Sequence, residues 1–317
     1  MHRIHRICIC VVAAIFILSC SGTAWGVQTE GTQANPLAWK FKVGDAYSLL
    51  FDQLSQTETL VLEREVKIKV RVKMQVSWTV DKVVDGNASI KQVIHWVTIT
   101  TTNTDPEGEV KTIAIDTRED PSDDLPSRTK KVIRDMLKDM RPIVGATSFF
   151  ELSPRGQIGK FTIPKETQQA LRDASSSMHL RQVFSTEGMN SILGPSAIEF
   201  PEKPVSEVQS WESTRKIENP IGKFDQSFKY EFDAEKSAKE KVAVVNVVSE
   251  TTKTEDGKEK IEITSQSGKG EIQFDSELGF MKASSFETNV ETKKSIRPDI
   301  DIITKTRDEV MIEVEKK

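Results

Sequence analysis

The clearest pattern in the chain is a run of apolar residues at every second position between residues 66 and 80, separated by Lys, Arg, Gln, Ser and Thr. A helix would scatter these side chains around its circumference, whereas a β-strand places them all on one face. The pattern therefore predicts one long strand with an apolar face and a solvated face. The apolar positions, which we also expect to line a groove for a ligand or else to form an ordinary core, are Val66, Ile68, Val70, Val72, Met74, Val76, Trp78 and Val80.

A strand of this length is unstable alone and needs partners of similar length on both sides. Asp85-Gly86 is a tight-turn pair that predicts a hairpin with a second strand over residues 89–102, where apolar residues occur on both faces. We therefore expect a meander of long, curved antiparallel strands. Further strands are predicted at residues 110–115, 149–152 and 157–163.

A helix is predicted over residues 128–141, with Ser127 as its cap and Pro142 as its end. Its apolar residues recur at helical spacing on one side, which is typical of a helix that covers a sheet. These residues are Val132, Ile133, Met136, Leu137 and Met140.

The β pattern returns after Pro201. Residues 288–294 and 301–314 alternate with many Thr, Lys and Glu, and this polar character predicts exposed or edge strands. The other strands of this part are predicted at residues 224–232, 242–248, 260–264, 271–275 and 280–286.

The predicted fold class is mainly β (α+β), with two similar β units and a few covering helices. The first unit spans residues 38–163, a helical connector spans 164–200, and the second unit spans 201–317. An ancient duplication and coincidence both remain open as explanations of the repeated spacings. The spacings are those of Trp39 with Trp211 and of Asp85-Gly86 with Asp256-Gly257.

Residues 1–26 read as an export signal, with a basic start, an apolar core and small residues before the expected cleavage site after Gly26. The alternative is Ile17-Leu18-Ser19-Cys20, which resembles a bacterial lipobox and would make Cys20 a lipidation site. Residues 27–37 are polar and aperiodic, which predicts a flexible leader. Either signal implies an exported protein that is periplasmic, secreted or lipid-anchored to the cell envelope.

Charge and cysteine content exclude several partners and sites. Without residues 1–26 the chain keeps 42 basic and 48 acidic residues, a formal charge of −6, which disfavours nucleic acid as a partner. All three cysteines, Cys8, Cys10 and Cys20, lie in the signal, so the rest of the chain has no disulfide and no Cys-ligated metal. No later segment is apolar for long enough to predict a membrane-spanning helix.

Candidate sites are few. His95 and His179 have no partner at metal-ligand spacing, and the sequence contains no G-x-S-x-G, H-E-x-x-H or P-loop motif. The acidic loop could hold calcium, but its spacing fits no EF-hand, and we favour a solvated loop that precedes a helix. We therefore expect no enzyme, cofactor or metal. The acids of the loop are Asp116, Glu119, Asp120, Asp123 and Asp124.

Two stretches carry a resemblance to known proteins. The opening Trp39-Lys-Phe-Lys-Val-Gly44-Asp45-Ala-Tyr47 and the hairpin from Gly270 to Gly279 resemble a family of secreted bacterial β-rich proteins of unknown function. More loosely, the expected architecture is similar to the half-barrel of periplasmic lipoprotein carriers. That resemblance implies a curved sheet around an apolar groove.

Three hypotheses follow. The first is a non-catalytic envelope or secreted protein that binds a lipid or another hydrophobic small molecule. The second is a structural or protein-interaction module of the cell envelope, with an envelope protein as its partner. The third, a carboxylate-based enzyme, would need acids paired in a cleft.

Overall fold

The computed structural model describes residues 37–62, 64–159, 161–174, 198–205, 208–219, 222–256, 261–297 and 300–317. The predicted signal with Cys20, the leader as far as residue 36, and His179 lie outside these residues. Within the described residues the chain forms an antiparallel sheet of eleven strands, three α-helices and one short 3-10 helix. The prediction of a mainly β fold built from long antiparallel strands is confirmed.

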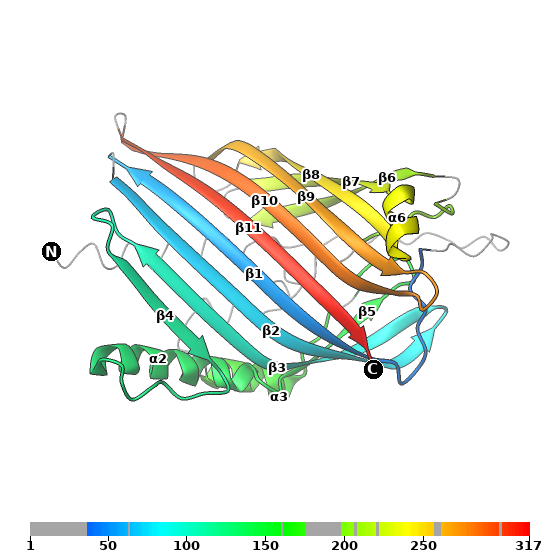
Figure 1. Ribbon diagram of the computed structural model, residues 1–317, viewed down its shortest axis with the longest axis horizontal. Helices are drawn as coiled ribbons and strands as arrows, with labels where there is room; N and C mark the ends of the chain where they lie inside the picture. Colours follow the sequence, from blue (N-terminus) through cyan, green and yellow to red (C-terminus); the bar gives the residue numbers. More distant parts are fainter. Residues whose placement is uncertain are drawn as a thin grey trace.

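The sheet has the strand order β4-β3-β2-β1-β11-β10-β9-β8-β7-β6, and β5 pairs with β3 beside β4. The long central strands run diagonally across Figure 1, and β5, β6 and β7 lie behind them, so the sheet bends. The strands are β1 (Ala46–Val61), β2 (Arg64–Val84), β3 (Asn87–Thr104), β4 (Val110–Asp116), β5 (Thr147–Leu152), β6 (Ser210–Asn219), β7 (Gly222–Phe232), β8 (Ala243–Asp256), β9 (Glu262–Asp275), β10 (Phe280–Arg297) and β11 (Ile300–Lys316).

The predicted long strand is β2, which spans 21 residues and lies between β1 and β3. Its neighbours span 16 and 18 residues, so the expectation of long partners on both sides is confirmed. Asp85 and Gly86 both have positive φ and join β2 to β3, as the tight-turn pair predicts. We call the face that carries the even-numbered residues 66–80 of β2 the inner face, and the opposite face the outer face.

A bulge in β3 explains why its apolar residues occur at both parities. The register passes from Gln75 opposite Trp96 to Val76 opposite Ile94, which leaves His95 as an extra residue. Ile94 before the bulge and Val97 after it are therefore both buried. The bulge turns the side chain of Trp96 to the outer face.

The prediction that residues 288–294 and 301–314 form exposed or edge strands is wrong in its edge assignment. They belong to β10 and β11, and β11 lies in the middle of the sheet between β1 and β10. The pairing of β1 with β11 runs from Tyr47 opposite Lys316 to Val61 opposite Ile302. The polar residues that suggested an edge alternate between a solvated outer face and an inner face that is itself polar at this point.

The same pairing joins the two predicted β units. All eleven strands belong to one continuous sheet, so the structure does not show two similar units side by side. The duplication stays a hypothesis about the sequence.

One end of the inner face is covered by a packed core, and we call it the packed end. Trp39 stacks on Phe41 at 5.6 Å and meets Phe274 edge-on at 5.8 Å, while Phe200 contacts Phe274 at 4.7 Å. The segment around Phe200 is held by Arg155, whose Nε donates to the Phe200 carbonyl at 2.9 Å. Aromatic side chains from three distant stretches of the chain therefore close this end.

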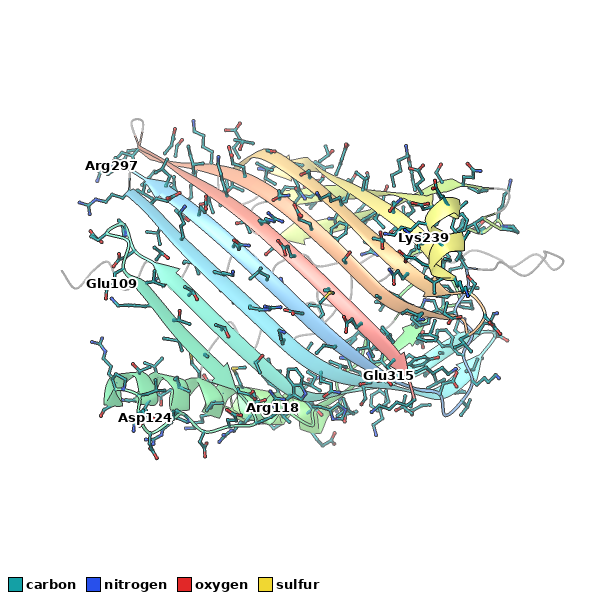
Figure 2. All side chains as sticks on the ribbon, viewed as in Figure 1. Glu109, Arg118, Asp124, Lys239, Arg297 and Glu315 are labelled. Atoms are coloured by element: carbon teal, nitrogen blue, oxygen red, sulfur yellow. The ribbon has the colours of Figure 1, made fainter. Side chains whose placement is uncertain are left out.

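The opposite end carries the turns β1–β2, β3–β4 and β10–β11, and we call it the far end. Figure 2 shows Arg297 and Glu109 at this end and Glu315 at the packed end. The two ends differ in how they cover the inner face, because the core contacts described above all lie at the packed end.

Helix α2 (Ser127–Met140) lies beside β4 (Figure 1) and continues into the 3-10 helix η3 (Arg141–Ile143). The predicted helix is confirmed within one residue at each end, but the predicted cap is wrong. Ser127 is the first helical residue, and Pro126 occupies the cap position without a side-chain hydrogen bond. The buried face is also narrower than predicted, since Val132 and Met136 are 40% and 37% exposed.

Helix α3 (Lys165–Ala174) begins the predicted helical connector, and residues 175–197 of that connector lie outside the described residues. Helix α6 (Ala234–Glu240) was not predicted. It is seven residues long and buries none of them, so it leaves no apolar periodicity in the sequence. Its N-terminus is capped by Asp233, whose side chain accepts the Lys236 N–H at 2.8 Å.

Candidate ligand-binding surface on the inner face

The eight residues of the predicted stripe all lie on the inner face, but in two environments. Toward the packed end, Met74, Val76, Trp78 and Val80 are buried in the core. Toward the far end, Ile68 is buried while three valines are partly exposed. The stripe is therefore core at one end and partly solvent-accessible surface at the other, and the accessible valines are Val66, Val70 and Val72.

Trp78 has a structural role at the packed end. Its Nε1 donates to Gln92 Oε1 at 2.9 Å, and Gln92 Nε2 donates to Ser148 Oγ at 3.2 Å. The ring of Trp78 also meets Phe150 edge-on at 5.1 Å. This buried network ties β2, β3 and β5 together and keeps Trp78 away from any ligand.

The neighbours of the accessible valines are polar. On β1, Gln53 lies opposite Val72, Ser55 opposite Val70, and Thr59 opposite Val66. Residues directly opposite each other in an antiparallel pair project from the same face. Beyond the packed core, the inner face is therefore amphipathic, with apolar side chains on β2 and hydroxyl and amide groups on β1.

One register row carries this polar character across most of the sheet, and we call it the polar row. It contains five hydroxyl-bearing side chains and one carboxylate, and neighbouring strands are about 4.8 Å apart. From β4 to β6, the row consists of Ile113, Thr101, Val70, Ser55, Asp308, Thr288, Gly268, Ser249, Phe228 and Ser213.

Asp308 is the carboxylate of this row and lies between Ser55 and Thr288. Burial raises the pKa of Asp308 to about 6, and the neighbouring Ser55 hydroxyl lowers it by less than burial raises it. Its Oδ1 atom is shielded from solvent and has no hydrogen-bond partner. A carboxylate in this state has an unmet capacity to accept hydrogen bonds.

Three further side-chain atoms on the inner face are also shielded from solvent and have no hydrogen-bond partner. They are Ser55 Oγ, Ser249 Oγ and Asn103 Oδ1. Ser55 and Ser249 belong to the polar row and are 7% and 1% exposed. Unsatisfied polar groups cost free energy in a folded protein and are rare, so four of them on one face of one sheet require an explanation.

An aromatic surface adjoins the row on β7 and β10. The ring of Phe286 lies over Gly268 and Gly270 of β9, where a Cβ atom would collide with it. Phe286 also contacts Phe228 at 6.3 Å, and the Arg215 guanidinium lies 4.9 Å from the centre of the Phe228 ring. The two glycines thus make room for an aromatic ring that lies flat on the inner face.

Closer to the packed end, the next rows are largely apolar, with Phe51 opposite Met74 on one side and Ile312 on the other. Along the strands, the inner face therefore changes from apolar to hydroxyl-rich within a few residues. Such a surface can bind a molecule that has one apolar and one polar part.

Sequence reasoning missed Asp308, Ser55, Thr288 and Ser249. The usable signal was the alternation on β11, where the inner-face residues Thr304, Thr306 and Asp308 are followed by Val310, Ile312 and Val314. That pattern is apolar at one end only, and considered alone it predicts an exposed or edge strand. The partners of these residues come from strands far away in the sequence, so the pattern alone did not show the row.

In the acidic loop, for which a solvated loop was favoured over a calcium site, Asp116, Asp120 and Asp123 contact basic side chains. Arg118 donates from Nη2 to Asp116 at 2.6 Å, and Arg141 donates from Nη2 to Asp120 at 2.7 Å. Lys130 Nζ lies 3.5 Å from Asp123 Oδ1. Nowhere in the described part of the chain do three or more His, Cys, Asp or Glu side chains form a group that could hold a metal ion.

His95 is the bulge residue of β3, and its Nε2 lies 2.8 Å from Ser77 Oγ on the outer face. This contact gives the histidine a structural role at the bulge.

Among the described residues, no helix is both long and apolar enough to cross a membrane.

Comparison with known proteins does not assign a family. No family model and no curated protein matches the sequence. Among solved structures, the chain is similar to lipovitellin, in a structure titled for its lipid–protein interactions, with 13% identity and a TM-score of 0.47. The match covers 87% of this chain but only 26% of the lipovitellin chain.

Two bacterial structures are more distant. The translocator domain of the autotransporter NalP from Neisseria meningitidis is 5% identical over 86% of this chain and 89% of that domain, with a TM-score of 0.22. An outer-membrane channel from Pseudomonas putida is 8% identical over 90% of this chain and 100% of that chain, with a TM-score of 0.19. All three TM-scores lie below 0.5, so none of these structures establishes the fold or the function of this chain. The resemblance to a family of secreted bacterial proteins stays a prediction.

Proposed function

We propose that this chain is a non-catalytic exported protein of the cell envelope or the secreted fraction, and that it holds a hydrophobic or amphipathic small molecule against its inner face. One observation carries the proposal. The apolar stripe of β2 continues beyond the packed core as partly exposed valines on the inner face of the bent sheet. These valines are Val66 and Val70, while Val72 at the border packs against the core.

Physical reasoning supports a ligand at this place. Removing apolar surface from water is favourable by about 25 cal/mol of free energy for each Å². The partly exposed valines on the bent sheet therefore favour binding of an apolar molecule. The aromatic contacts of the core lie at the packed end, and toward the far end Val66 and Val70 are only partly buried, although Ile68 between them is buried. The export signal predicted in residues 1–26 agrees with a binding role outside the cytoplasm.

The experiment is extraction of co-purified lipid. The chain is purified without detergent, its small molecules are extracted with organic solvent, and mass spectrometry compares the wild type with Val70→Asp. Val70 is a partly exposed inner-face residue, so we expect its charged variant to fold and to lose most of the bound material. Val84→Asp is the matched control, because Val84 lies on the same strand and is 48% exposed.

Co-purified lipid that is the same in the wild type and in Val70→Asp would contradict binding at this face. A wild type that yields no apolar compound, and that takes up none when lipid vesicles are supplied, would contradict the proposed function itself.

A second candidate function is a protein-interaction module of the envelope. Strand β6 forms an edge of the sheet and pairs only with β7 among the described strands, so its outer edge can accept a strand from a partner. Because every cysteine lies in residues 1–26, a single introduced thiol would be the only one in the processed chain. Thr214→Cys on β6 should then cross-link to one defined envelope protein, whereas Lys131→Cys on α2 should not.

A further inference from the structure

The polar row contains acceptors that lack donors. In the row, Asp308 Oδ1 can only accept when its carboxyl is ionised, while Ser55 Oγ and Ser249 Oγ can accept or donate; Asn103 Oδ1, outside the row, is a further acceptor. Ser55 and Ser249 are more than nine-tenths buried, and Ser55 lies directly opposite Asp308. The Ser55 hydroxyl faces Asp308, yet Asp308 Oδ1 has no hydrogen-bond partner, so an additional donor would satisfy this carboxylate.

Apolar surface flanks the row on both sides. Val70 and Ile113 lie in the row on β2 and β4, and Phe286 and Phe228 pack beside it on β10 and β7. The next inner-face row toward the packed end contains Val72, Val310 and Val247. A molecule bound at Asp308 and Ser55 would therefore meet acceptors there and hydrocarbon or aromatic side chains around them, while Ser249 lies three strands away on β8.

We propose that the polar row is a recognition site for the hydrogen-bond-donating, non-anionic head of an amphipathic ligand, with Asp308 as the residue that selects the head. This inference rests on the proposed function and adds to it the chemical class of the ligand. An alkyl chain with an ammonium or hydroxyl head fits the site, because its head supplies donors to Asp308 and Ser55 and its chain covers the valines and phenylalanines. An anionic head is disfavoured, since it would place a second negative charge beside Asp308.

The experiment compares three ligands that share a twelve-carbon chain and differ only in the head: dodecylamine, dodecanol and dodecanoate. Each is titrated below its micelle-forming concentration, at pH 8, into protein loaded with the neutral fluorescent probe N-phenyl-1-naphthylamine, and displacement of the probe gives the Kd. The variants are Asp308→Asn, which keeps the size of the side chain, and Ser55→Ala. Asp52→Asn on the outer face is the matched control for loss of a carboxylate, because Asp52 lies on the outer face and is bound by Arg71.

For the wild type and for Asp52→Asn, we expect dodecylamine to bind at least about tenfold more tightly than dodecanoate, as a charge-assisted hydrogen bond implies. Asp308→Asn should bring the two Kd values within about twofold of each other and should leave dodecanol within about twofold of the wild type, since the apolar contacts are unchanged. Ser55→Ala should weaken dodecylamine and dodecanol alike.

The experiment distinguishes failure of the head-group inference from failure of the proposed function. If all three compounds bind the wild type with equal Kd, or if Asp308→Asn leaves the preference for dodecylamine intact while circular dichroism shows a folded chain, the head-group inference is overturned and the proposed function stands. If none of the compounds and not even the fluorescent probe binds the wild type, both are overturned.

Discussion

Arg71 clamps Asp52 on the outer face of the sheet, where its Nε and Nη2 donate to the two carboxylate oxygens at 2.8 Å and 2.5 Å. Asp52 is on β1 and Arg71 on β2, and Lys73 Nζ adds a third contact at 3.2 Å. The side chain of Asp52 is 8% exposed, so this carboxylate is the shielded member of the group. The Arg71 guanidinium holds the pKa of Asp52 below its ordinary value, against the opposing effect of burial.

Asp52→Asn should lower the free energy of unfolding at pH 7 by about 1–2 kcal/mol, a range kept small because Arg71 itself is half-exposed. A carboxyl whose pKa is lowered by folding stabilises the protein fully above its unfolded pKa and loses that effect as the pH falls. The difference between wild type and variant should therefore be constant above about pH 4 and shrink below it. Urea denaturation at a series of pH values measures both.

Glu58→Gln is the matched control, because Glu58 pairs with Lys67 in the same two strands but both side chains are about half exposed. It should change the unfolding free energy by less than about 0.5 kcal/mol. An equal loss in both variants would show that the shielding of Asp52 is unimportant.

Asp308→Asn should stabilise the ligand-free protein at neutral pH, whereas Asp52→Asn should destabilise it. Burial raises the pKa of Asp308 from 3.8 to about 6, so the ionised carboxylate is disfavoured in the folded state. Each tenfold change in an acid dissociation constant is worth about 1.4 kcal/mol, which gives a gain of up to about 3 kcal/mol at pH 8. Thermal or urea unfolding of ligand-free protein measures it.

The sign of the pH dependence distinguishes Asp308 from Asp52. An acid with a raised folded-state pKa makes the wild type lose stability as the pH rises from about 4 to about 6, after which the loss is constant. Asp308→Asn should thus equal the wild type below pH 4 and exceed it above pH 6. A variant that is less stable than the wild type at pH 8 would mean that the carboxylate has a stabilising partner.

The local part of the fold was predictable from sequence. The alternation in residues 66–80 gave β2, and Asp85-Gly86 gave its hairpin, because both depend on residues that are adjacent in the chain. Even the mixed faces of residues 89–102 carried information, since they mark the bulge at His95. Burial of a whole face then required long neighbours, and β1 and β3 supply them.

The polar row was not predictable, because it depends on the register of strands that are far apart in sequence. Ser55 and Asp308 are partners only because the last strand pairs with the first. A strand with Thr304, Thr306 and Asp308 on one face resembles an edge strand when it is considered alone. Its place in the centre of the sheet, and hence the polar inner surface, follows from the closing pair β1–β11.

Gly270→Ala should be strongly destabilising because the added methyl has no space. An ideal Cβ at Gly270 would lie 2.5 Å from the Ser285 carbonyl oxygen and would also collide with the Phe286 ring. The backbone carbonyl cannot move without breaking the pairing of β9 with β10, so we expect a loss of about 2–3 kcal/mol. Urea denaturation of the variant measures it.

Gly268→Ala distinguishes a clash with side chains from the clash with the backbone carbonyl at Gly270. The atoms nearest to its Cβ would be side-chain atoms, namely Ser249 Oγ and the Phe286 ring, so the double variant Gly268→Ala with Phe286→Leu should recover part of the loss. Gly270→Ala should recover less with the same second change, since the carbonyl clash persists. Equal recovery at both positions would contradict the backbone argument.

Two glutamines that each bridge a tryptophan and a serine give the last prediction. Gln92 accepts from Trp78 Nε1 at 2.9 Å and donates to Ser148 Oγ at 3.2 Å, and it is 1% exposed. Replacing it by leucine leaves a buried indole N–H and a buried hydroxyl without partners, so Gln92→Leu should cost about 2–4 kcal/mol of unfolding free energy.

Gln75 is the matched control on the outer face. It accepts from Trp96 Nε1 at 2.6 Å and donates to Ser48 Oγ at 3.2 Å, but Gln75 and both partners are only partly buried. Water can replace the lost hydrogen bonds there, so Gln75→Leu should cost less than about 1 kcal/mol in the same urea denaturation experiment. The difference between the two variants reports mainly on burial, because the substitution and the types of hydrogen-bond partner are the same in both. If Gln75→Leu cost as much as Gln92→Leu, the packed end would not be drier than the outer face.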